Sequence, residues 1–341
     1  MKHIATILTA IIIMASCSDG GNRQDGAYGP FIVETINKTT PVKNQGRGPL
    51  CWIYAMLATI EGDRLMQGDS VNLSPDYVAR LYLRRLAVRG YTSHGLDSVS
   101  PRATAPLLLR LIDENGLMPY DSYHSDCNYN VVSRRLDTLV RQSVAGRTGI
   151  ARMLKTADDM LDDNINPVPW HVYMLGAEYT PVEFAHSVCL PGEYESLTSF
   201  THEPFYEDIP LDLPDNISGE RFHNLPIDSL MNRVMSALRS GRTVCWEGDT
   251  TEPGFSFAEG TARLRPDETE LSQQARQRMF ETFATTDDHC MALIGLARDT
   301  GGHRYFICKN SWGTANPYHG LMFMSVEYAR MKTVAVVMRR E

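Results

Sequence analysis

Basic residues are in short supply in this sequence, which excludes one class of partner. The 341 residues include 33 Lys and Arg against 41 Asp and Glu, a formal net charge of −8 at pH 7. A chain of this charge lacks the positive field with which proteins attract phosphate backbones, so we exclude nucleic acid as a partner. Its hydrophobic content of 43% is enough to build a sizeable core, and we expect a globular protein.

A long hydrophobic run is also missing at the N-terminus, where the apolar residues 4–15 are too few to span a bilayer. With Lys2 ahead of it, this run is typical of an export signal. Small residues and then Cys17 follow, and the pattern resembles the lipobox of bacterial lipoproteins. The resemblance implies a signal peptide over 1–16, a lipidated Cys17 and a polar tether over 17–30. We expect the protein to be lipid-anchored in the bacterial cell envelope, in the outer membrane and facing the periplasm or the surface; an ordinary cleaved signal peptide is the alternative.

Cysteine spacings typical of structural zinc are absent. None of the seven cysteines forms a CxxC pair or pairs with His at zinc spacing, so we predict no metal site and no cofactor. Setting aside Cys17 and one nucleophile leaves five of the seven, an odd number that cannot all pair within the chain. Cys245 and Cys308 lie in strand-like runs, where we expect buried reduced thiols.

The predicted helices come first along the chain and most of the predicted strands come last. Ser74 is suited to cap a helix, and Gly68 and Gly116 are suited to end one. Apolar periodicity predicts helices over 51–68, 72–87, 104–116, 131–144 and 225–241. Strand-like runs cover 242–248, 289–297, 304–312, 320–326 and 333–338. This order predicts an α+β arrangement with two lobes.

Three separated residues could together make a thiol nucleophile. Cys51 stands at the predicted start of a helix, where backbone N–H groups and the helix dipole lower the pKa of a thiol. His289 opens an apolar strand, and Asn310 ends the next one. A base and a group that orients it are what a thiolate nucleophile requires, and Trp312 could keep water off the bond between them.

Each of these residues has a plainer interpretation when it is taken alone. Cys51 beside Trp52 would more often be core, and His289 could be a buried histidine with a satisfied ring. Asp287 and Asp288 are interpreted as a solvated loop rather than a metal site. Only the combination of the motifs favours catalysis.

Three stretches carry a family resemblance, "PVKNQGRGPLCWIYA", "DDHCMALIGL" and "KNSWGT". They resemble the papain-type cysteine peptidases in order and spacing. The resemblance implies that Cys51 is the nucleophile, His289 the acid and base, Asn310 the residue that orients His289, and Gln45 the side chain of the oxyanion hole. Weaker similarity, in stretches such as "SPDYVARLYLRRL" and "PIDSLMNRVMSALRSGRTVCWEGDTTEPG", resembles the bleomycin hydrolase and aminopeptidase C branch.

The resemblance implies a papain-like two-lobed α+β fold within a peptidase domain over 31–341. We expect a helical lobe over about 45–125, a helical insertion over about 125–225 and an antiparallel, β-barrel-like lobe over about 226–341. Bleomycin hydrolases extend a C-terminal arm into the cleft, whereas this chain stops soon after its last predicted strand. The sequence therefore leaves open endopeptidase or aminopeptidase action and the oligomeric state.

The function implied is hydrolysis of peptide bonds through an acyl-enzyme, by an aminopeptidase or broad oligopeptidase that acts on peptide substrates. Pro49 and Leu50 depart from the small residues usual beside the nucleophile. Two alternatives stay open at this point: a non-catalytic peptide-binding envelope lipoprotein, and an amidase or acyl-transferase that acts on a non-protein amide.

Overall fold

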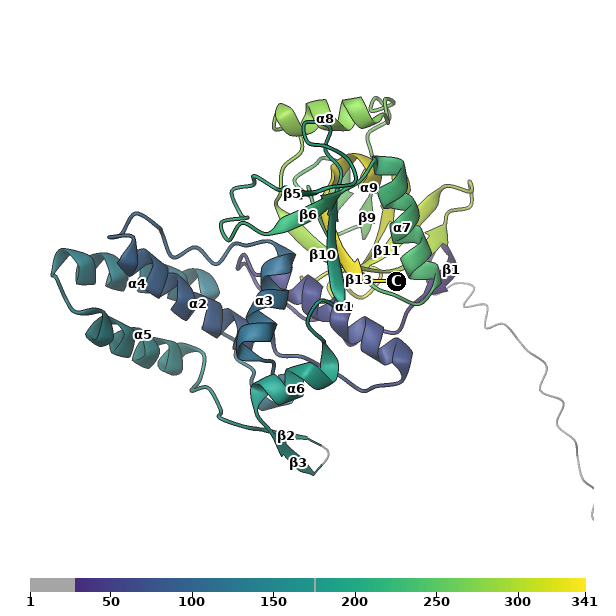
Figure 1. Ribbon diagram of the computed structural model, residues 1–341. Coiled ribbons are helices and arrows are strands. Elements are labelled where there is room, and N and C mark those ends of the chain that lie inside the picture. Colours follow the sequence, from purple (N-terminus) through teal and green to yellow (C-terminus); the bar gives the residue numbers. More distant parts are fainter. Residues whose placement is uncertain (1–27, 175) are drawn as a thin grey trace, which may run out of the picture.

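The computed structural model describes residues 28–174 and 176–341 and has two lobes, one mainly helical and one built on a large sheet (Figure 1). The predicted signal peptide over 1–16 and the lipidation site Cys17 lie outside the described residues. Within the described part of the chain, no helix is long and apolar enough to cross a membrane.

The helices gather mainly in the first half of the chain, as the sequence predicts (Figure 1). They are α1 Cys51–Gln67, α2 Pro75–Thr92, α3 Ala105–Asn115, the 3-10 helix η1 Tyr120–Ser122, α4 Tyr129–Ala145, α5 Ile150–Asn164, α6 Pro181–Val188, α7 Ile227–Arg239, α8 Gln273–Glu281 and α9 Val326–Lys332.

The predicted helix ends are confirmed. The Ser74 hydroxyl accepts a hydrogen bond from the Tyr77 backbone N–H and caps α2. Gly68 ends α1 in the left-handed conformation. Gly116 ends α3 at a φ of +84°, and a Cβ there would lie 2.2 Å from the Pro181 carbonyl oxygen, so glycine lets α3 approach α6 closely.

The sheet of the second lobe is assembled from distant parts of the chain. Its strands run in the order β5-β6-β4-β13-β7-β10-β11-β12-β9-β8, and β1 pairs with β10 at the side. The strands are β1 Ile32–Ile36, β4 Tyr194–Thr198, β5 Asp208–Pro210, β6 Arg221–Asn224, β7 Val244–Gly248, β8 Phe255–Ser256, β9 Thr261–Ala262, β10 His289–Arg298, β11 Arg304–Lys309, β12 Leu321–Ser325 and β13 Thr333–Arg339; β2 Val172–Met174 and β3 Ala177–Tyr179 form a separate hairpin.

The boundary predicted near residue 225 differs from the structure. The first part of the 125–225 stretch is helical as expected, but β4 pairs antiparallel with β13, and β6 pairs with β4. These strands cover an edge of β13 whose backbone groups would otherwise lack partners. The β-rich lobe therefore takes in residues from about 194, and frequent prolines between its short strands hide them from periodicity.

The core is centred on α1, which lies between the lobes (Figure 1). The predicted apolar face of Ile53, Leu57 and Ile60 is buried, and so are most residues on the other faces up to Asp63. A helix buried all round is held by neighbours on every side, and here they include α2, α3 and strand β10. This fixes the position of the first residue of α1, Cys51.

Candidate active site

A cleft of about 960 Å³ lies at the N-terminal end of α1 and is lined from both lobes. The helical side contributes Cys51 and Arg102 together with Asn130, Ser133 and Arg134 of α4. The β-rich side contributes residues 287–290 and Trp312. Gln45 and the loop that follows it form part of the wall. The structure therefore brings the separated sequence motifs to one place.

Cys51 is the first residue of α1 and carries an acidic thiol. A hydrogen bond with the Cys290 side chain, together with the hydrogen bond and charge of His289, holds the pKa of Cys51 well below its ordinary value, although burial opposes this shift. The thiol also lies among the first backbone N–H groups of the helix, which favour negative charge. These contacts favour a thiolate at neutral pH.

His289 and Asn310 are joined by a hydrogen bond. His289 opens β10 and is 4% exposed, and its Nε2 lies 2.8 Å from Asn310 Oδ1. The two residues meet because β10 and β11 are adjacent antiparallel strands, in which Ala292 faces Lys309. The Trp312 ring lies 4.5 Å from the His289 ring and covers this bond, as the sequence predicts.

Gln45 is held in place at the rim of the cleft. Its Nε2 donates to the Gly48 carbonyl at 2.7 Å, and its Oε1 accepts from the Ser311 hydroxyl at 2.5 Å. The amide nitrogen carries two hydrogens, so one is left to donate to a substrate oxygen. Pro49 lines the cleft, whereas Leu50 is fully buried and packs into the core behind it.

Sequence analysis missed one residue that contacts the thiol. Cys290 is 2% exposed on β10, and its side chain hydrogen-bonds that of Cys51. A small hydrophobe in an apolar strand carries no sequence signal for such a role. Cys245 and Cys308 are buried and free, as predicted.

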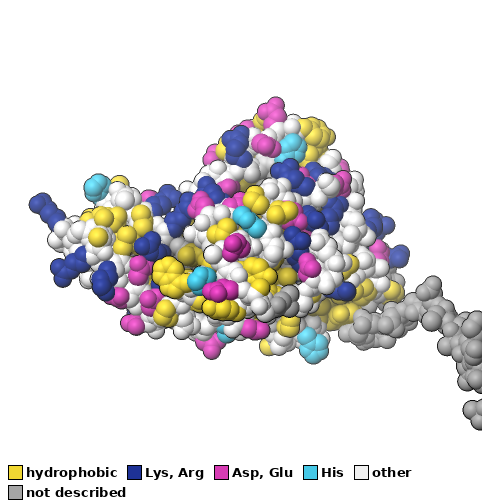
Figure 2. Space-filling model, turned by 60° about the horizontal axis from the view of Figure 1, so that its bottom comes forward, with side chains coloured by type: hydrophobic (Ala, Val, Ile, Leu, Met, Phe, Trp, Pro, Cys, Tyr) yellow, Lys and Arg dark blue, Asp and Glu magenta, His cyan; other side chains and the backbone are white. Residues whose placement is uncertain are grey.

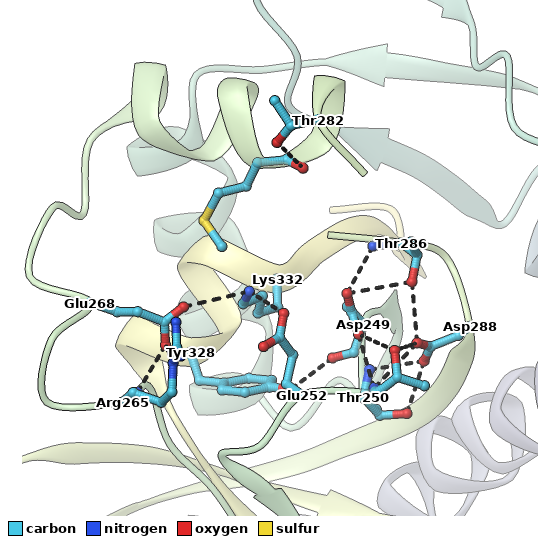
Figure 3. A network of polar contacts seen from close by, with 12 residues as sticks. Asp249, Thr250, Glu252, Arg265, Glu268, Thr282, Thr286, Asp288, Tyr328 and Lys332 are labelled. Atoms are coloured by element: carbon cyan, nitrogen blue, oxygen red, sulfur yellow. Dashed lines mark hydrogen bonds and ion pairs between the residues drawn. The ribbon is translucent and has the colours of Figure 1, made fainter. Parts of the chain in front are cut away.

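The interpretation of Asp287 and Asp288 as a solvated loop is wrong. Asp288 is half-buried and is directed toward Thr250 and Thr286 (Figure 3), and it accepts from both the N–H and the hydroxyl of Thr250. Asp287 is also half-buried and lines the cleft. Burial, and then the negative charge of Asp215, raise the pKa of Asp287 to about 7. The loop is ordered because it packs against the end of β7.

Comparison with known families agrees with this site. Residues 171–341 match the model of the Peptidase C1-like family. The chain belongs to this family. The protein is thus a hydrolase, a cysteine-type peptidase.

Named relatives extend the similarity over most of the chain. The peptidase is 26% identical over 386 aligned residues to aminopeptidase W of Lactobacillus delbrueckii subsp. lactis, covering 93% of this chain and 86% of the relative. It is 26% identical to aminopeptidase E of Lactobacillus helveticus over 50% of this chain and 41% of that protein.

A solved structure shares the fold of the peptidase. The crystal structure of pepw from Lactobacillus rhamnosis superimposes with a TM-score of 0.71 at 18% identity, covering 92% of this chain and 83% of the other. The predicted papain-like, two-lobed α+β fold is confirmed.

Proposed function

We propose that the peptidase is an aminopeptidase that cleaves peptide bonds through an acyl-enzyme on Cys51. The observation that carries this proposal is the bond between His289 and Asn310 beside a thiol of low pKa, within one cleft. The relatives named aminopeptidase W and aminopeptidase E support the preference for a free N-terminus.

The attack step follows from how the nitrogens of His289 are engaged. Nε2 is bonded to Asn310, which leaves Nδ1 for the sulfur of Cys51 and for the substrate. The thiolate attacks the carbonyl carbon and an S–C bond forms. The carbonyl oxygen, now negative, can accept from Gln45 Nε2 and from the backbone N–H of Cys51.

The intermediate then breaks down in two proton transfers at His289. The imidazolium gives its proton to the leaving amine as the peptide C–N bond breaks, and Cys51 keeps the acyl group. His289 next takes a proton from a water molecule that attacks the thioester, and the acid product leaves with the thiolate restored. Asn310 holds the ring orientation throughout, because it accepts from the ring nitrogen that does not react.

Replacement of the nucleophile tests the proposal directly. Cys51→Ala should abolish hydrolysis of fluorogenic aminoacyl amides and labelling by the epoxide inhibitor E-64, while circular dichroism shows a folded chain. Full turnover in this variant would contradict the assignment. If peptide amides are not cut by the wild type but a non-protein amide is, the amidase alternative holds instead.

We also propose that the protein is exported and lipidated at Cys17. The support is the sequence alone, with its apolar run over 4–15 followed by small residues and the cysteine. Palmitate fed to expressing cells should label the wild type but not Cys17→Ala. Equal palmitate labelling of the wild type and Cys17→Ala would contradict lipidation at Cys17.

A further inference from the structure

Two carboxyl groups that the proposed mechanism does not use lie near His289, one in the wall of the cleft and one buried behind it. Glu247, on β7, is 2% exposed, and its Oε2 has no hydrogen-bond partner within the described part of the chain. Asp287 lines the cleft, and its Oδ2 likewise has no such partner there. The two carboxyl groups are close enough to shift each other's pKa: Asp287 raises that of Glu247, and Glu247 lowers that of Asp287.

Glu247 keeps its proton because of where it lies. Burial, and then the charge of Asp287, raise the pKa of Glu247 well above its ordinary value. A neutral Glu247 therefore supports a carboxylate at Asp287 and does not compete with it for a cation. Because burial, and then the charge of Asp215, raise the pKa of Asp287 to about 7, the pair presents one full negative charge to the cleft above that pH.

Asp287 also differs from the other acidic residues that border the cleft. Asp215 is paired with Arg102, whose Nε lies 2.8 Å from its carboxylate. Asp288 accepts hydrogen bonds from Thr250 and also from Thr251, within the network that Figure 3 shows. Among these three, in the residues that the structure describes, only Asp287 lacks a basic or hydroxyl partner for its side chain. Arg102 donates to the backbone carbonyl of Asp287 at 3.3 Å but not to its carboxylate, so the carboxylate can accept from a ligand cation.

The position of Asp287 suits one cation in particular. It lies two residues before His289, and both side chains face the cleft, so at about 3.3 Å per extended residue they are separated by roughly 7 Å. In a peptide, the α-nitrogen of the first residue lies only about 2.5 Å from the carbonyl carbon of the same residue. An ammonium group close to the attacked carbon is therefore within reach of a carboxylate beside His289.

We propose that Asp287, supported by Glu247, binds the free α-ammonium group of the substrate and so makes the enzyme remove single N-terminal residues. This inference rests on the proposed aminopeptidase function.

The test compares substrates with free and blocked N-termini in the full-length wild type and in Asp287→Asn, which keeps the shape and removes the charge. For a free leucyl amide we expect kcat/KM to fall by about 10- to 100-fold, mainly through KM, because a hydrogen bond to a charged group is lost. For the N-acetyl leucyl amide we expect no fall in kcat/KM. The ratio of kcat/KM between the free and the blocked substrate should therefore drop by about the same 10- to 100-fold in Asp287→Asn. Asp287→Glu, which keeps the carboxylate, should retain that preference.

Controls separate this inference from the proposed function. Asp159→Asn is a matched change on the exposed face of α5 and should leave both substrates unaffected. Stoichiometric alkylation of Cys51 by iodoacetamide shows that each variant is folded with an accessible site. If the wild type cuts neither substrate, the proposed function fails.

Two results would overturn the inference while leaving the peptidase function intact. One is an unchanged preference for free amines in Asp287→Asn. The other is a fall in kcat/KM of Asp287→Asn that is confined to N-terminally blocked peptides with Arg just before the residue whose carbonyl is attacked. That result would show that Asp287 binds a basic side chain and not the α-ammonium group.

Discussion

At the scale of the residue, the state of Cys51 depends on a second sulfur. Cys290 follows His289 in the chain, and its thiol forms a hydrogen bond with the Cys51 thiol, not a disulfide. Burial, and then that hydrogen bond, raise the pKa of Cys290 well above its ordinary value, so it remains a neutral donor. The nucleophile is thus stabilised as an anion by a neutral thiol as well as by His289.

Removal of this donor should raise the pKa of Cys51. In Cys290→Ala we expect the pH at which iodoacetamide alkylation of Cys51 reaches half its maximal rate to move upward, toward the value of about 8.5 for a free thiol. The sign follows because the donor stabilises only the charged form. Cys290→Ser keeps a donor and should move the midpoint less. Identical midpoints in Cys290→Ala and the wild type would show that Cys290 has no part in the acidity.

At the scale of the element, α1 is tied to the segments on both sides of the site through Glu61. This carboxylate is fully buried; it pairs with Lys43 at 2.6 Å and accepts from the Leu73 backbone N–H at 2.7 Å. Its other oxygen accepts from the Thr40 hydroxyl and lies 3.9 Å from the Nζ of Lys309, next to Asn310. One residue of α1 therefore links the loop that carries Gln45 to strand β11, which ends at Lys309 just before Asn310.

Breaking this link should be costly. Glu61→Ala leaves two lysines and a backbone N–H without their partner, and we expect a loss of about 3 kcal/mol in the free energy of unfolding. Glu114→Ala removes an exposed partner of Arg85 and should change it by less than about 1 kcal/mol. Urea denaturation followed by circular dichroism measures both. Equal small losses would mean that the Glu61 cluster contributes little.

At the scale of the whole molecule, neither lobe is complete without the other. α1 packs on β10, and β1, which precedes the helical lobe in the chain, pairs with β10 in the sheet. Acidic and basic side chains are interspersed over the face seen in Figure 2. The cleft lies where the lobes meet, so both must be in place to form it.

The two lobes should unfold together. We expect thermal unfolding of the full chain, followed by circular dichroism and by exposure of the buried thiols, to give one coincident transition, because both lobes share α1. A fragment over 226–341 lacks α1, β1 and β4, and should bind the dye ANS through its uncovered apolar faces. Two separate transitions, or a fragment that folds and does not bind the dye, would contradict this view.

The sequence by itself predicted the long helices α1, α2, α3, α4 and α7, the late strands and the candidate site residues Cys51, His289, Asn310 and Gln45, but not α5, α6, α8 or α9. These were predictable because periodicity and capping act locally, and because the three motifs retain their order and spacing. The tertiary structure alone decided the rest. Glu247, Asp287 and Cys290 come from strands or strand ends whose side chains meet only after the sheet forms, and β4 was hidden because its partner β13 lies more than a hundred residues away. Burial decided the chemistry of these groups, since a carboxyl or thiol changes its proton affinity only when the fold removes it from water.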